Sequence, residues 1–173
     1  MKSIIIGIIA IAIIVGAGFW VSGRYNQALT VVQEDLSVQV KNGTYIIDGE
    51  KVVLNNGLDA KSVTKYFGNQ VVCDTSGSGF NDIYFILTQT PGGSGTFYYL
   101  ASAVGKMEGP VGGPTILLGD RISPQTTECK DGLVVVNYAD RKQDEPFSEV
   151  PSVGVSRYFK LQNNNLVEAF PNK

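Results

Sequence analysis

Tyr45-Ile46-Ile47-Asp48-Gly49-Glu50-Lys51-Val52-Val53-Leu54 is the stretch that decides the fold class of this 173-residue chain. Two short runs of β-branched, aromatic and other apolar residues flank Asp48-Gly49, a dipeptide that accepts the positive φ angles of a two-residue hairpin turn. The stretch therefore predicts a β-hairpin.

The same turn chemistry recurs later in the chain. Asp131-Gly132 predicts a hairpin between strands at 126–130 and 133–138, and the asparagines at 163–165 predict one between 156–161 and 166–170. Further apolar runs predict strands at 70–73, 83–90, 96–104 and 115–122. We therefore expect a mainly β domain, an antiparallel sandwich or rolled sheet of about nine strands.

The segments between these strands are expected to be one helix and three loops. Asp59 is a candidate N-cap for a short helix over 59–67, in which Val63, Tyr66 and Phe67 share a face. The glycine- and proline-rich stretches 91–95 and 109–114, and the charged stretch 140–151, are expected to be loops.

The N-terminal part of the chain predicts a membrane anchor. Residues 4–21 carry no charged side chain, and as a helix they would measure about 27 Å, close to the hydrocarbon thickness of a bilayer. Lys2 and the free amino terminus favour a single-pass span, residues 1–23, with the N-terminus cytoplasmic and the C-terminal domain extracytoplasmic. The alternative is a signal peptide cleaved near Val21-Ser22-Gly23.

A short stalk is expected between the anchor and the β domain. Tyr25, Leu29, Val32 and Leu36 follow the spacing of one helical face, which predicts a helix over 24–40. The exported β domain is then 41–173.

The amino-acid composition excludes several classes of function. Lys and Arg total 14 against 16 Asp and Glu, so the chain lacks the basic surface that nucleic-acid binding requires. The sequence contains no histidine, which excludes Ser-His and Cys-His catalysis and histidine-ligated zinc. We therefore expect no nucleic-acid partner.

The stretch 74–82 resembles the Asp-x-Asn-Gly-Asp-Gly-x-x-Asp calcium loop of β-propeller and cell-surface repeat proteins. Asp74 and Asp82 match its first and ninth positions, whereas serines replace its Asn and second Asp, which depletes the negative charge that holds Ca²⁺. The candidate ligands of a weakly bound Ca²⁺ are Asp74, Ser76, Ser78, Phe80 and Asp82. The alternative is a tight glycine turn without metal.

A wider resemblance spans roughly 45–170. It is carried by the 74–82 loop, by Gly92-Gly93-Ser94-Gly95-Thr96-Phe97-Tyr98-Tyr99-Leu100, by Leu118-Gly119-Asp120-Arg121, and by the Asp131-Gly132 hairpin. Together they resemble an uncharacterised exported domain of bacterial envelope proteins, related to the LppP/LprE lipoproteins. The resemblance implies location and architecture and brings no catalytic residue with it.

Cys73 and Cys129 are the two cysteines of the chain. Outside the cytoplasm they are able to form a disulfide. The alternative is a pair of buried thiols.

Four acids are the candidates for carboxylate catalysis: Asp120, Asp140, Asp144 and Glu145. Asp120-Arg121 and Asp140-Arg141 favour structural ion pairs instead, so no catalytic and no cofactor-binding residue is assigned. The sequence favours a non-catalytic binding or interaction module of the cell envelope, whose partner is an envelope protein or polymer. The alternative is an extracytoplasmic hydrolase that uses carboxylate acid/base residues.

Overall fold

The structure is a computed structural model that describes residues 36–61 and 63–171. The chain is helical over 36–40 and then forms eleven strands among the described residues. Their bounds are β1 Thr44–Ile47, β2 Glu50–Asn55, β3 Leu58–Asp59, β4 Thr64–Cys73, β5 Asp82–Gln89, β6 Phe97–Val104, β7 Val111–Asp120, β8 Ser123–Lys130, β9 Leu133–Asp140, β10 Val153–Gln162 and β11 Asn165–Ala169. The prediction of a mainly β fold is confirmed.

The compact unit that contains these strands extends over Val38–Lys173. The predicted anchor, residues 1–23, and the stalk up to residue 35 lie outside the described residues. Within 36–61 and 63–171, no helix has the length and apolar character needed to cross a bilayer.

The three predicted hairpins are confirmed. Asp48 and Gly49 have φ angles of 49° and 85° between β1 and β2, and Asp131 and Gly132 have 52° and 73° between β8 and β9. Asn163 and Asn164, at 50° and 59°, join β10 to β11. Both central residues of each turn have positive φ, as a two-residue hairpin that follows the right-handed strand twist requires.

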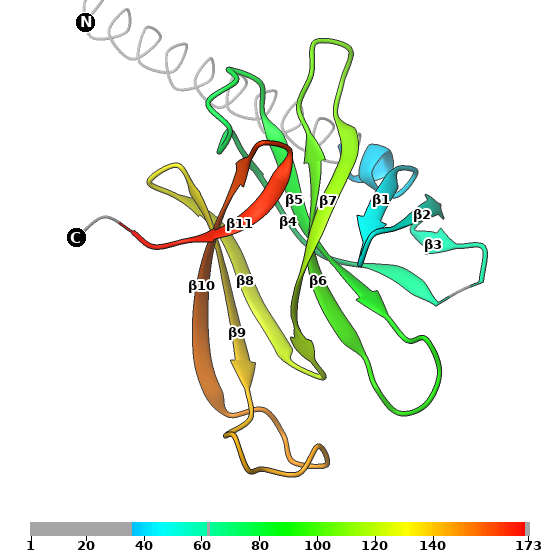
Figure 1. The fold of residues 1–173 in the computed structure, drawn as a ribbon, viewed down its shortest axis with the longest axis vertical. Coiled ribbons are helices and arrows are strands. Elements are labelled where there is room, and N and C mark those ends of the chain that lie inside the picture. The colour runs from blue at the N-terminus through cyan, green and yellow to red at the C-terminus, as the bar shows by residue number, and fades with distance from the viewer. Residues whose placement is uncertain (1–35, 62, 172–173) are drawn as a thin grey trace, which may run out of the picture. The chain divides into compact units, whose positions relative to one another are not determined.

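Strands β1 to β7 form a closed barrel (Figure 1). Its neighbours pair antiparallel around the ring, except that β1 and β7 close the barrel by a parallel pairing at Ile46 and Pro114. The hydroxyl of Thr115 adds a hydrogen bond of 2.8 Å to the Ile46 carbonyl.

Two glycines let β7 approach its neighbours closely. A Cβ on Gly112 would lie 2.2 Å from the Thr44 carbonyl oxygen at the closing pair with β1, and one on Gly113 would lie 3.0 Å from the Ser102 hydroxyl on β6. The expectation that 109–114 is a loop is therefore wrong from Val111 onward, because these glycines serve the close approach of two strands rather than a turn.

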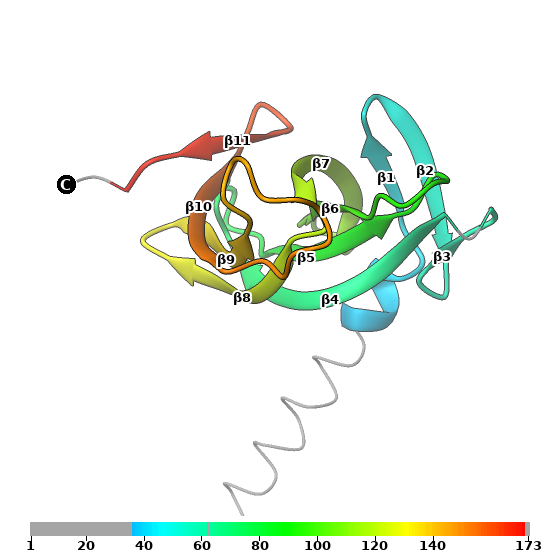
Figure 2. The same cartoon turned by 90° about the horizontal axis from the view of Figure 1, so that it is seen from below.

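The second sheet has the order β11-β10-β9-β8 and is antiparallel throughout. Figure 2 shows it on one side of the barrel strands β4 and β5, with β1, β2 and β3 on the other. Its inner face forms one hydrophobic core with the outer face of the barrel, in which Val134, Tyr138 and Phe159 pack with Tyr84 and Ile86.

Alternate side chains of β5 pack in two different hydrophobic cores. Tyr84 and Ile86 belong to the core shared with the second sheet. Phe85 points the other way, and its ring contacts those of Tyr45 and Tyr66 from β1 and β4 at centroid distances of 5.2 and 5.4 Å. The run 82–87 is completely buried for this reason.

The helix expected over 59–67 is wrong. Leu58–Asp59 and Thr64–Cys73 are strands, and Asp59 accepts a hydrogen bond of 2.8 Å from the Thr64 amide across the connection between them. The pairing of Thr64 to Tyr66 with β5 prevails over the helical spacing of the apolar residues. The stretches 91–95 and 141–152 are loops among the described residues, as expected.

Candidate functional site

The 74–82 loop is organised around the Asp74 carboxylate. One oxygen accepts hydrogen bonds from the Gly77 and Ser78 amides at 2.8 and 3.3 Å and from the Ser76 hydroxyl at 3.1 Å. The other accepts from the Gly79 amide at 2.9 Å. These hydrogen bonds, of which the one from the Gly79 amide has the largest effect, lower the pKa of Asp74 from its ordinary value. The side chain is therefore an ionised acceptor at neutral pH.

Asp82, the second carboxylate of the loop, is fully buried. One of its oxygens accepts a hydrogen bond of 2.9 Å from the Gly105 amide, and the other accepts one of 3.2 Å from the Tyr84 hydroxyl. The Tyr84 hydroxyl also contacts the Thr75 hydroxyl, whose oxygen accepts a bond of 3.0 Å from the Leu161 amide on β10. Asp82 therefore ties the loop to the barrel, and Thr75 ties it to the second sheet.

These contacts bear on the predicted calcium site. Both oxygens of both carboxylates face N–H or O–H donors, whose partial positive charge occupies the side on which a cation would bind. Ser78 exchanges hydrogen bonds with the main chain of Phe80 at 3.2 and 3.4 Å. No group of three or more acidic or cysteine side chains able to hold a metal occurs within 36–61 and 63–171. The calcium site stays a prediction.

The disulfide is confirmed. Cys73 at the end of β4 and Cys129 on β8 are bonded, with their Cα atoms 5.8 Å apart. Cys73 is buried, whereas Cys129 lies at the exposed edge of the second sheet. The bond joins the barrel to the second sheet, which pack against each other through the shared core but pair separately.

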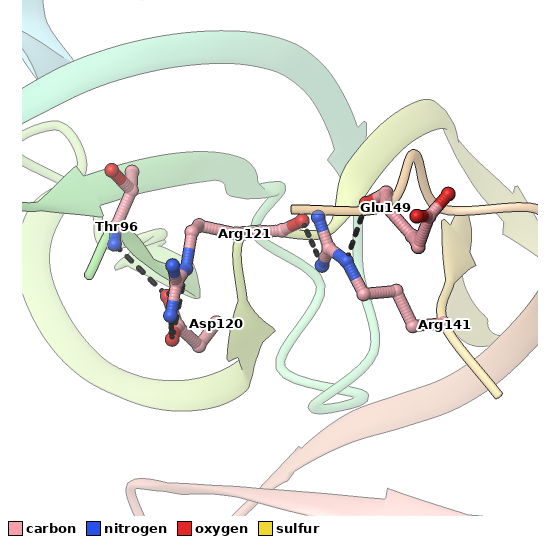
Figure 3. A network of polar contacts seen from close by, with 5 residues as sticks. All are labelled: Thr96, Asp120, Arg121, Arg141 and Glu149. Carbon is pink, nitrogen blue, oxygen red and sulfur yellow. Dashed lines mark hydrogen bonds and ion pairs between the residues drawn. The ribbon is translucent and has the colours of Figure 1, made fainter. Parts of the chain in front are cut away.

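Asp120 and Arg121 form an ion pair between β7 and β8 (Figure 3). Two guanidinium nitrogens of Arg121 bind the Asp120 carboxylate at distances down to 2.8 Å, and the Thr96 amide donates to it at 2.9 Å. The Arg121 carbonyl accepts from Arg141, which also donates to the Glu149 carbonyl at 2.6 Å. The network fastens the 141–152 loop to the end of β7.

This network argues against acid catalysis by the candidate residues. The bonds from Arg121 lower the pKa of Asp120, and the amide of Lys142 lowers that of Glu145. A general acid needs a raised pKa to hold its proton at neutral pH, so neither carboxyl is suited to that role. Asp140 accepts a hydrogen bond of 2.8 Å from the Arg141 amide, and Asp144 lies in the same loop.

A groove on the barrel is the candidate ligand site. Its cavity volume is about 670 Å³, and it lies between β2, the connection from β3 to β4, and the end of β5. Its lining is apolar at Val52, Val53, Val63 and Pro91, and it also carries two acids, Glu50 and Asp59, and two lysines, Lys51 and Lys61. Its volume is within the range of small-ligand sites, roughly 300–1,000 Å³.

Hydrogen bonds hold one wall of the groove in place. Thr64 is buried, donates its amide hydrogen to Asp59, and accepts a hydrogen bond of 3.4 Å from the Gln89 side chain. Val53, by contrast, is 61 % exposed, so an apolar surface is open to solvent. Sequence reasoning missed this groove because its lining comes from β2, the connection from β3 to β4 and the end of β5, which meet only when these strands pair. The Asn56-Gly57 turn, with φ angles of 52° and 84°, was the available signal for the β2–β3 hairpin, whose two strands contribute to the lining.

Comparisons with protein-family models, with curated proteins and with solved structures find no match to this chain.

Proposed function

We propose that this chain is a membrane-anchored, non-catalytic binding module of the bacterial cell envelope, and that its ligand occupies the groove on the barrel. The observation that carries the binding role is the groove itself, an open cavity of about 670 Å³ whose lining combines apolar side chains with two lysines and two acids. Such a lining suits an elongated ligand with both apolar and polar parts, a segment of an envelope protein or polymer.

The placement in the envelope rests on other observations. The uncharged run 4–21, the exported-domain resemblance over 45–170 and the disulfide support it, because disulfides persist outside the reducing cytoplasm.

Binding is favoured over hydrolysis because two of the acids considered for catalysis are held in structural ion pairs. Asp120 is fixed by Arg121 and Thr96, and Glu145 is paired with Lys142. A hydrolase of this type needs one carboxyl that keeps its proton and another that faces it across an open cleft.

The groove is tested by photo-crosslinking in living cells. A photoreactive amino acid replaces Val53, 61 % exposed on β2, and, as the matched control, Val153, 37 % exposed on β10 in the other sheet. The proposal expects a discrete adduct from position 53 and none from position 153. Equal labelling at both positions, or none at either, would overturn the groove as the binding site.

The placement is tested separately with protease. The 141–152 loop is the longest connection between described strands and carries the exposed Phe147 and Val150. Protease is expected to cut there in cells whose outer barriers are permeabilised and whose cytoplasmic membrane is intact. A chain that stays intact until the cytoplasm is opened would contradict the proposed location.

A further inference from the structure

The groove on the barrel runs along an open edge of β2. Strand β1 pairs with one side of β2 at all four residues from 50 to 53. In the described part of the chain, β3 pairs with the other side only at Leu54 and Asn55. The β2 residues that line the groove, 50–53, therefore have a strand on one side and the cavity on the other.

The main-chain groups of Lys51 and Val53 face this cavity. The Leu54 amide points toward β1, where it donates to the Gly43 carbonyl at 2.9 Å. Because these groups alternate in direction along a strand, those of Lys51 and Val53 point away from β1. Asn55, the next residue in the alternation, uses the same side to pair with β3. Among the residues that the structure describes, Lys51 and Val53 have no strand partner on that side.

The opposite wall of the groove has its own main-chain partners. The Val63 carbonyl accepts a hydrogen bond of 2.9 Å from the Thr90 amide, and the Thr64 amide donates to Asp59 at 2.8 Å. That wall offers the apolar side chains of Val63 and Pro91 in place of a second edge. The unpaired groups of β2 therefore face a cavity of about 670 Å³ whose far side is partly apolar.

An unpaired strand edge is complementary to another main chain. A second strand offers one N–H and one C=O group toward the edge at every other residue, with a rise of about 3.4 Å per residue. A polysaccharide offers hydroxyl groups without this repeat. Addition of an extended peptide to an exposed edge is a general mode of recognition, in which main-chain bonds give affinity and side-chain pockets give specificity.

We propose that an extended peptide segment of the partner adds to β2 as an antiparallel strand and continues the ladder that β3 leaves after Asp59. The direction follows from the two strands that already pair with β2, both of which are antiparallel to it. The inference rests on the proposed function, because it names the ligand of the same groove: a protein segment and not a polysaccharide.

Lys51 sets the charge of the peptide. Its side chain is exposed and forms no ion pair within 36–61 and 63–171. The residue opposite it in an added strand lies about 5 Å away on the same face, so an acid is favoured there. Glu50 and the half-buried Val52 belong to the other face of β2. Lys61 brings a second positive charge to the groove, whereas the Asp59 carboxylate already accepts a main-chain hydrogen bond.

The test uses the full chain, labelled with nitrogen-15, in detergent micelles. The probe is the blocked peptide Thr-Val-Asp-Val-Thr, whose central acid lies opposite Lys51 and whose valines lie on the face of Val52. Millimolar peptide is expected to shift the amide resonances of Lys51 and Val53 in a saturable manner.

Two N-methylated versions of the peptide form a matched pair. Methylation of the aspartate nitrogen removes the hydrogen that faces β2, and it is expected to weaken binding at least about ten-fold, as the loss of a hydrogen bond implies. Methylation of the valine that follows removes a hydrogen that points away from β2, so its affinity is expected to stay close to that of the unmodified peptide.

Variants of the chain test the same edge from the other side. Val53→Pro removes an amide hydrogen that faces the groove, at an edge position where proline is tolerated, and Val53→Ala keeps that hydrogen. The proposal expects peptide binding to be lost in Val53→Pro and retained in Val53→Ala. If Val53→Pro fails to fold, the two N-methylated peptides still decide the question.

The outcomes separate this inference from the proposed function. Equal affinities of the two N-methylated peptides, or no shift at Lys51 and Val53 with any peptide, would overturn strand addition. An adduct from position 53 in cells would then leave the groove standing with another ligand. Peptide binding without an adduct in cells would support the edge and remove the proposed function. Shifts at Lys51 and Val53 that grow with chain concentration in the absence of peptide would assign the edge to a second copy and overturn the proposal.

Discussion

Arg157 on β10 donates two hydrogen bonds to the carboxylate of Glu168 on β11, from Nε to Oε1 at 3.0 Å and from Nη2 to Oε2 at 2.9 Å. Its third nitrogen, Nη1, donates to the Leu117 carbonyl on β7 at 2.9 Å. One guanidinium thus connects the edge strand of the second sheet to the barrel. The planar fork of arginine provides this geometry, which the single ammonium of lysine lacks.

We expect a double-mutant cycle to detect this pair. Arg157→Lys and Glu168→Gln each remove the bidentate contact, and their coupling in urea denaturation is expected to be about 1 kcal/mol, at the upper end for exposed ion pairs. The two side chains are 22 % and 40 % exposed, so solvent screens the attraction. Strictly additive effects of the two substitutions would show that the pair contributes nothing.

The Arg157–Glu168 pair also predicts that the stability of the fold depends on pH. Hydrogen bonds from Arg157 lower the pKa of Glu168 below its ordinary value of 4.5. A carboxyl whose pKa is depressed on folding stabilises the native state above its unfolded pKa, and that contribution is lost as pH falls through the folded value. The stability difference between the natural chain and Glu168→Gln is therefore expected to be constant near neutral pH and to shrink below about pH 4.5. Denaturation curves at pH 7 and pH 3 check this.

The disulfide is expected to contribute strongly to the free energy of unfolding. Cys73 and Cys129 are 56 residues apart, and a crosslink over a loop of that length stabilises by about 4 kcal/mol in the loop-entropy model. We expect the Cys73→Ala/Cys129→Ala chain to unfold at lower urea than the oxidised natural chain. Reductant is expected to move the natural chain toward the same midpoint and to leave the double variant unchanged. A natural chain whose midpoint is insensitive to reductant would contradict the prediction.

The hairpins were predictable from the sequence because their determinants are local. Asp48-Gly49, Asp131-Gly132 and the asparagines after Gln162 each fix two positive φ angles, and the strands on either side follow from the turn. The disulfide was predictable only as one of two alternatives, because pairing Cys73 with Cys129 needs the separation of β4 and β8 in space.

The barrel was not predictable because its determinants are contacts between distant segments. Gly112, Gly113 and Pro114 have the composition of a loop, yet they lie in β7, where a Cβ on Gly112 would collide with β1, one on Gly113 would crowd β6, and Pro114 pairs with Ile46. Tyr66 and Phe67 likewise fit a helical face, but pairing with β5 makes them part of a strand. The groove was not predictable because it needs the positions of β2, the β3–β4 connection and the end of β5 in space.

Closure of the barrel predicts that alanine destabilises the fold far more at Gly112 than at Gly154. In Gly112→Ala the new methyl group would meet the Thr44 carbonyl at 2.2 Å, which the main chains of β1 and β7 cannot absorb without separating. We expect a loss of about 3 kcal/mol or more, or a chain that fails to fold. Gly154→Ala, on β10, is the control, because nothing lies within 4 Å of its Cβ position. Equal melting temperatures for the two variants would contradict this account of the closure.

The Asp74 loop predicts the response to calcium. Gly77, Ser78 and Gly79 already donate their amide hydrogens to the Asp74 carboxylate, so a bound Ca²⁺ would have to displace these bonds while only two carboxylates of the loop supply charge. We expect the natural chain to melt at the same temperature in Ca²⁺ and in chelator. Asp74→Ala is expected to speed proteolysis within 74–81 under both conditions, because the amides lose their acceptor. A melting temperature that rises with Ca²⁺ in the natural chain and not in Asp74→Asn would instead establish the metal site, since a ligand that binds only the native state stabilises it.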